Sequence, residues 1–120
     1  MKKILLALVA VVLIVSGVSE PAAIAKTKTK TVKVTSTAYC GGGKTATGYN
    51  LSKHKNAKVV AVDPHYIKLG SKVYVPGYGT AVARDTGGAI KGKKIDVHFK
   101  TRHQALKWGR KHVKIKVYRR

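Results

Sequence analysis

Three aspartates are the residues of this sequence best suited to do chemistry. The 120-residue chain has 25 Lys and Arg but only 4 Asp and Glu, and three of those acids, Asp63, Asp85 and Asp96, lie beyond residue 25. A carboxyl group can donate a proton and accept it again. Burial or a second acid nearby raises its pKa toward the pH range in which such proton transfer is effective. None of the three lies on a periodic polar face, where charges usually serve solubility. They are therefore candidates for acid–base chemistry.

Each aspartate also has a structural alternative, as a turn cap or as the partner of a lysine. Asp63 precedes a proline, and Asp-Pro commonly begins a turn, so both roles suit it equally. Asp85 precedes Thr-Gly-Gly, which could form an Asx-turn, although its position favours a functional role. Asp96 lies between two apolar residues of a strand, where Asp is disfavoured and costly to bury without a partner. The structural alternative is weakest for Asp96.

Short strands must position these aspartates. Alternating apolar and polar residues predict six strands, and clusters of Gly and Pro mark the turns between them. Residues 101–110 alone read as a helix, because Thr101 and Gln104 form a capping box, Gly109 fits the exit, and Trp108 is expected to face the core. The predicted strands are residues 31–39, 58–63, 72–75, 80–84, 94–99 and 113–117. This pattern favours an all-β fold, a small barrel with one short helix.

The first 25 residues are predicted to be a targeting segment rather than part of the fold. Two lysines precede an apolar run at residues 4–15, and Ala23-Ile24-Ala25 forms a small-x-small cleavage pattern, so we expect a secretory signal peptide. The run is short for a bilayer span, which needs roughly 20 residues, so no stable membrane anchor is expected. Residues 26–32 alternate Lys and Thr and predict a flexible basic lead-in. Residues 33–120 then form one small domain.

Several classes of protein are disfavoured by what the sequence lacks. It contains neither G-x-G-x-x-G nor G-x-x-x-x-G-K-[ST], which argues against a nucleotide-binding α/β domain. The five His show no metal-ligand spacing, so we expect no metal and no cofactor. Cys40 is the single cysteine, expected to be half-buried and unable to form an internal disulfide. His98 shares a strand face with Asp96 and is expected to border the same cleft.

Four stretches resemble a known family, the 3D domain, which is named for three aspartates. Residues 60–64, 67–70, 73–79 and 83–97 carry the resemblance, and the last contains Asp-Thr-Gly-Gly-x-Ile-Lys-Gly-x-x-Ile-Asp. Thr37-Ala38-Tyr39 and residues 45–48 also fit. One departure is Lys68, where the family usually has Pro; this change loosens a loop but touches no acid. The resemblance covers residues 33–119 and implies a six-stranded double-psi β-barrel similar to the catalytic barrel of lytic transglycosylase A.

The resemblance also implies an activity. Such an enzyme breaks the β-1,4 bond between N-acetylmuramic acid and N-acetylglucosamine and leaves a 1,6-anhydro product. One carboxylic acid protonates the leaving oxygen and then, as a carboxylate, accepts the proton of the attacking C6 hydroxyl. Carried over to this chain, Asp96 is the acid/base, Asp85 helps hold its proton and Asp63 shapes the cleft. The substrate-binding residues implied are Thr37, Tyr39, Gly87, Gly88 and Lys91.

The sequence is also compatible with two other functions. The barrel could be a non-catalytic, expansin-like module that binds or loosens the wall, or a glycoside hydrolase that uses Asp85 as base and Asp96 as acid. The net charge of +21 indicates an anionic partner. The signal peptide favours anionic wall polymers and peptidoglycan glycan strands over nucleic acid. We expect a secreted, wall-associated monomer.

Overall fold

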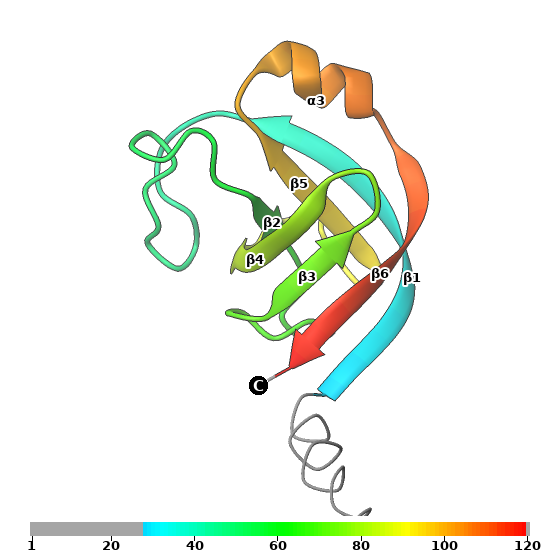
Figure 1. Cartoon of the computed structure of the whole chain (residues 1–120). Helices are drawn as coiled ribbons and strands as arrows, with labels where there is room; N and C mark the ends of the chain where they lie inside the picture. The colour runs from blue at the N-terminus through cyan, green and yellow to red at the C-terminus, as the bar shows by residue number, and fades with distance from the viewer. Residues whose placement is uncertain (1–27, 120) are drawn as a thin grey trace, which may run out of the picture.

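Six strands close into a barrel in the computed structural model, which describes residues 28–119 (Figure 1). Around the barrel the order is β1-β5-β2-β4-β3-β6. The elements are β1 (Lys28–Cys40), β2 (Val59–Ala61), β3 (Lys72–Val75), β4 (Gly79–Asp85), β5 (Lys94–Phe99), α3 (Arg102–Trp108) and β6 (Lys111–Arg119). The predicted all-β fold, a six-stranded barrel with one short helix, is confirmed. The predicted signal peptide lies outside the described residues.

Strand β1 is longer than the sequence pattern indicated. Residues 28–36 pair with β6 in antiparallel fashion, beginning with Lys28 opposite Arg119, and residues 35–40 pair with β5 in parallel fashion. Residues 28–30, predicted only as a flexible lead-in, are therefore strand, and the strand predicted from residue 31 onward begins earlier than expected. The Lys/Thr alternation that suggested a loose segment has the period of two that also suits a strand with one face in water. Pairing with β6 makes this segment a strand rather than a flexible lead-in.

The barrel interior is filled mainly by β-branched side chains. Along β5, Ile95 and Val97 are fully buried whereas Asp96 between them is partly exposed, so the alternation of the strand sends Asp96 to the outer face. Each fully buried Val or Ile contributes about 1.5–3 kcal/mol of transfer free energy. Other fully buried side chains are Val59, Val60, Val62, Val73, Val75 and Ile115. The same packing that stabilises the barrel thus fixes which residues face outward.

Helix α3 connects β5 to β6 and packs its single buried residue, Trp108, onto the barrel. Thr101 and Gln104 form the predicted capping box, and Gly109 ends the helix. The indole Nε1 of Trp108 donates to Ser36 Oγ at 3.0 Å, which satisfies a hydroxyl that is itself fully buried. Within the described residues, no helix has the length and apolar content needed to cross a membrane.

Cys40 is exposed, contrary to the expectation of a half-buried residue. It is the last residue of β1, where the chain leaves the barrel for the glycine-rich segment at residues 41–43. Past the end of a strand the alternation of buried and exposed positions no longer predicts burial.

Candidate functional site

Asp85 and Asp96 flank the short strand β2. In the register, Ala61 of β2 pairs with Asp85 of β4 on one side and with Asp96 of β5 on the other. The two aspartates are therefore two strand spacings apart, about 10 Å between Cα atoms. An irregularity between Val60 and Ala61 shifts the register, so that Asp85 rather than Arg84 comes opposite Ala61. The bulge brings a second carboxylate to the neighbourhood of Asp96.

The carboxyl group of Asp96 is half-buried and held by a threonine. Thr37 pairs with Asp96 in the parallel β1–β5 register, and its hydroxyl donates to Asp96 Oδ1 at 2.9 Å. Burial raises the pKa of Asp96 above its ordinary value, and the negative charge of Asp85 raises it further. The Thr37 hydrogen bond and the charge of Lys94 act in the opposite direction but do not cancel the shift. The surroundings of Asp96 thus favour its protonated form more than water does.

Asp85 has the opposite environment, one rich in donors. Its Oδ1 accepts from the backbone N–H groups of Ala46 and Thr86, both at 2.9 Å, and its Oδ2 accepts from the Tyr39 hydroxyl at 3.2 Å. Three donors suit an ionised carboxylate. Burial, and then the charge of Asp85, raises the pKa of Tyr39, so the phenol keeps its proton and acts as a donor. Two carboxyl groups near each other therefore have different partners, as a proton donor and a charged neighbour would require.

The carboxyl group of Asp63 accepts hydrogen bonds that hold two segments of the backbone together. Its Oδ1 accepts from the backbone N–H of His65 at 3.0 Å and lies 3.0 Å from the His65 ring, and its Oδ2 accepts from the backbone N–H of Gly92 at 2.8 Å. These bonds lower the pKa of Asp63 to about 2, with the Gly92 N–H as the largest cause. The carboxylate joins the turn after β2 to the loop before β5. Among the hydrogen bonds of residues 28–119, none joins Asp63 to Asp85 or Asp96.

We expect Asp63→Asn to make the protein less stable at neutral pH, by several degrees in Tm. Because folding lowers the pKa of Asp63 from 3.8 to about 2, its contribution to stability is present above pH 4 and is lost as the pH falls through about 2. The difference in Tm between wild type and Asp63→Asn should therefore shrink as pH falls from about 4 to about 2. Thermal melts across this range, with the exposed Lys72→Gln as control, measure it. A difference that stays constant with pH would contradict this role.

The remaining predicted site residues are divided between the aspartate pair and the loop that follows β4. Thr37 and Tyr39 contact the pair directly, as described above. A Cβ added to Gly87 would lie 2.9 Å from Cγ1 of the buried Ile90, so the loop itself requires this glycine. A Cβ at Gly88 would meet no atom within 4 Å, and both Gly88 and Lys91 are exposed. The last two are therefore accessible to a ligand.

The loop at residues 41–57 is a part of the site that the sequence did not reveal. It supplies the Ala46 N–H to Asp85, and His98 holds both of its ends: His98 Nδ1 lies 3.2 Å from Ala57 O, and Nε2 lies 3.2 Å from Gly41 O. The ring of His98 also packs edge-on against Tyr39, with centroids 5.3 Å apart. The period of two did place His98 on the face of Asp96. Its burial under this loop depends on how the loop folds back, for which the sequence has no local signal.

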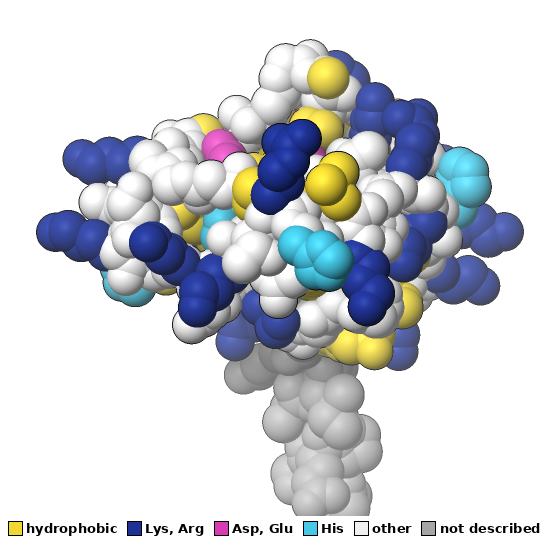
Figure 2. Space-filling model, turned by 90° about the horizontal axis from the view of Figure 1, so that it is seen from above, with side chains coloured by type: hydrophobic (Ala, Val, Ile, Leu, Met, Phe, Trp, Pro, Cys, Tyr) yellow, Lys and Arg dark blue, Asp and Glu magenta, His cyan; other side chains and the backbone are white. Residues whose placement is uncertain are grey.

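Five surface grooves of residues 28–119, of about 140–480 Å³, are lined by residues other than Asp85 and Asp96. Lys and Arg side chains are spread over the face of the molecule seen in Figure 2, and acidic atoms show only in small patches. Residues 28–119 hold no group of three or more His, Cys, Asp or Glu placed to bind a metal ion.

Comparison with known proteins gives relatives of this barrel. Two proteins of Bacillus subtilis (strain 168), the putative cell wall shaping protein YabE and the cell wall-binding protein YocH, are each 59% identical to it over 93 residues. That match covers 73% of this chain but 23% and 32% of theirs, so the chain spans about a quarter to a third of their length. The uncharacterized SPbeta prophage-derived protein YorM of the same strain is 41% identical over 88 residues, which are 66% of this chain and 37% of that protein.

The chain also matches a solved structure and a family model. The Streptomyces papain inhibitor superposes with a TM-score of 0.57 at 17% identity, over 76% of this chain and 96% of its own, which shows a shared fold. The model of the 3D domain matches residues 58–119, a range that contains Asp63, Asp85 and Asp96. The matched range covers more than half of the sequence, and the chain belongs to the 3D domain family.

Proposed function

We propose that this protein cleaves the glycan strands of peptidoglycan at the bond between N-acetylmuramic acid and N-acetylglucosamine. The observation that carries the proposal is the environment of Asp96. It projects from β5 to the outer face, burial and Asp85 raise its pKa, and the Thr37 hydroxyl fixes its orientation. A proton held on a half-buried carboxyl group at the surface is what protonation of a leaving glycosidic oxygen requires.

In the proposed reaction Asp96 acts twice. Its proton goes to the bridging oxygen as the bond from that oxygen to C1 of the muramoyl sugar breaks and positive charge develops on the ring. The resulting carboxylate then accepts the proton of the muramoyl C6 hydroxyl, whose oxygen forms a new bond to C1. The product is a 1,6-anhydro sugar, no water is consumed, and Asp96 regains its proton. Ionised Asp85, held by Tyr39 and two N–H groups, keeps the Asp96 pKa high and favours the positive ring.

The cell wall is the proposed location and substrate source. The names of two relatives describe cell wall binding and cell wall shaping, and the sequence begins with a predicted secretory signal. A net charge of +21 suits a surface that carries phosphate and carboxylate groups. We therefore propose a secreted protein that associates with peptidoglycan and anionic wall polymers.

A second candidate function is wall binding without cleavage. The name of one relative, a cell wall-binding protein, is in keeping with it. In this case the outward-facing polar residues would contact sugar without transferring a proton.

The products of digestion distinguish these functions. We expect purified peptidoglycan incubated with the protein to release soluble muropeptides that end in 1,6-anhydro sugars, detected by mass spectrometry. Muropeptides with reducing ends would show instead that Asp85 and Asp96 direct a water molecule, as in a hydrolase. Pelleting of the protein with the wall without any soluble product would leave binding as the function.

A further inference from the structure

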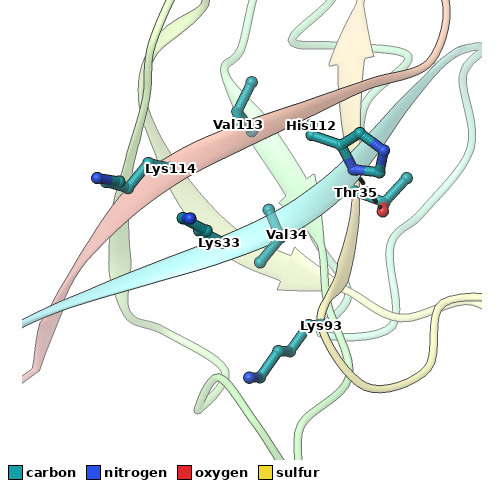
Figure 3. A pocket seen from close by; sticks show the side chains of 7 residues that line it. All are labelled: Lys33, Val34, Thr35, Lys93, His112, Val113 and Lys114. Carbon is teal, nitrogen blue, oxygen red and sulfur yellow. Dashed lines mark hydrogen bonds between the residues drawn. The ribbon is translucent and has the colours of Figure 1, made fainter.

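A groove of about 480 Å³ opens on the ribbon formed by β1 and β6 (Figure 3). Lys33 and Lys114 are direct cross-strand partners at one end, and Thr35 and His112 are partners at the other. Lys93 also lines the groove, from the turn before β5, and Figure 3 shows it beside β1, across that strand from Lys114. The groove is therefore lined by three cationic side chains, two on the sheet and one on the turn beside it.

The charges of this groove have no counter-ion within the described residues. Like charges directly opposite each other on neighbouring strands destabilise a sheet, and Lys33 and Lys114 are such a pair. The acids of residues 28–119 are Asp63, Asp85 and Asp96, and all three are engaged elsewhere, as described above. Within this range no Lys or Arg lies within 4.0 Å of a carboxylate oxygen. The sheet thus holds a repulsion that an external anion would relieve.

The backbone holds the cations in a fixed frame. The N–H of Thr35 donates to the carbonyl of Lys93 at 3.0 Å, which attaches the turn before β5 to β1. At the far end the Thr35 hydroxyl and His112 Nδ1 are 3.2 Å apart. The backbone positions of the three lysines are therefore set before a ligand arrives, although each side chain still loses rotamer freedom on binding.

The lining of the groove selects the kind of anion. Lysine side chains present aliphatic stems below their amines, so the walls combine apolar contact with positive charge. The ring of His112 is the one ring in the lining, which leaves little surface for stacking the bases of a nucleic acid. Three neighbouring cations favour a chain that repeats a full negative charge. A polyol chain joined by phosphodiesters combines such charges with short aliphatic links.

We propose that this groove binds a phosphodiester polymer of the cell wall, with phosphates at Lys33, Lys93 and Lys114. The proposal rests on the cell-wall location proposed above, but not on the cleavage reaction. Thr35 and Thr37 face the same side of β1 and lie about 7 Å apart along it. A polymer in the groove is thus held beside the aspartate pair, and it would keep the barrel on the wall next to the glycan.

The test measures binding of fluorescently labelled poly(glycerol phosphate) to the purified protein and to Lys33→Gln/Lys114→Gln. We expect the double variant to bind about tenfold more weakly at ~0.1 M salt. The slope of log affinity against log salt should become shallower by about 1.4, since each lost phosphate contact accounts for about 0.7. The control Lys53→Gln/Lys72→Gln removes the same charge from exposed positions outside the groove, and we expect a change of less than about twofold.

Thermal melts keep the result interpretable if the variant folds differently. Removing the opposed charges should leave its Tm unchanged or raised, and added polymer should raise the Tm of wild type more than that of the variant. An equal loss of binding in the control, or tighter binding of single-stranded DNA of equal length, would overturn the proposal. Asp96→Asn should bind the polymer as wild type does, so failure of cleavage and failure of this site are separable.

Discussion

Asp96→Asn should abolish the release of soluble muropeptides from peptidoglycan, with a loss of at least about a thousandfold in rate. General acid–base catalysis contributes roughly 10²–10⁴, and this one group serves as both acid and base in the proposed reaction. The amide has nearly the shape of the carboxyl group and can still accept from Thr37, but it has no proton to give at any accessible pH. The measurement is initial rate of product release, followed by mass spectrometry of the muropeptides.

The same experiment separates chemistry from folding and from adhesion. Asp96→Asn should keep the Tm of wild type within a few degrees, or exceed it, because it removes a half-buried carboxyl group near a second negative charge. Lys72→Gln, exposed on β3, is the matched surface control and should retain activity. Undiminished product release by a folded Asp96→Asn protein would remove the proposed reaction altogether.

Asp85→Asn should change the pH dependence of cleavage as well as its rate. The first step needs protonated Asp96, so activity falls as pH rises through the Asp96 pKa. The charge of Asp85 raises that pKa, and its removal lowers the pKa and shifts the basic limb of the profile to lower pH. Near neutral pH we expect a loss on the order of a hundredfold, since less of the acid is protonated and ring charge is no longer offset. Rates measured from pH 4 to pH 8 test this.

Tyr39→Phe is the comparison that isolates charge from hydrogen bonding. It removes the donor to Asp85 Oδ2 but leaves the negative charge and its two backbone donors in place. Its basic limb should therefore stay where wild type has it, whatever happens to the maximum rate. A profile that moves equally in both variants, or in neither, would show that Asp85 does not act on Asp96 through its charge.

Local sequence signals determined most of the elements. Alternating Ile95, Asp96 and Val97 fixed both the strand and the outward direction of the acid, because a pleated strand inverts its side chains at every residue. Thr101 and Gln104 located the start of α3, because a capping box acts within one helical turn. The wrong expectations are the loose segment at residues 28–30 and the half-buried Cys40. Both lie at the ends of β1, where contacts with partner strands and loops determine the structure.

The roles of the three aspartates likewise depend partly on local sequence and partly on contacts with distant segments. The resemblance to the 3D family grouped Asp63 with the other two, but the structure ties its carboxylate to the N–H of Gly92, 29 residues away. No pattern near Asp63 predicts that bond. The donors to Asp85 likewise come from Tyr39 and Ala46, distant segments whose approach depends on how the barrel closes.

The sequence by itself therefore determined the strands, the helix cap, the family and the scarcity of acids among many lysines. The tertiary structure alone decided that Thr37 meets Asp96, that β2 separates Asp85 from Asp96, and that Lys33 lies opposite Lys114. The physical reason is the separation along the sequence over which each kind of interaction acts. Alternation and capping act between residues a few positions apart, whereas the choice of strand partner is a property of the whole barrel, which closes only when every core side chain is buried at once.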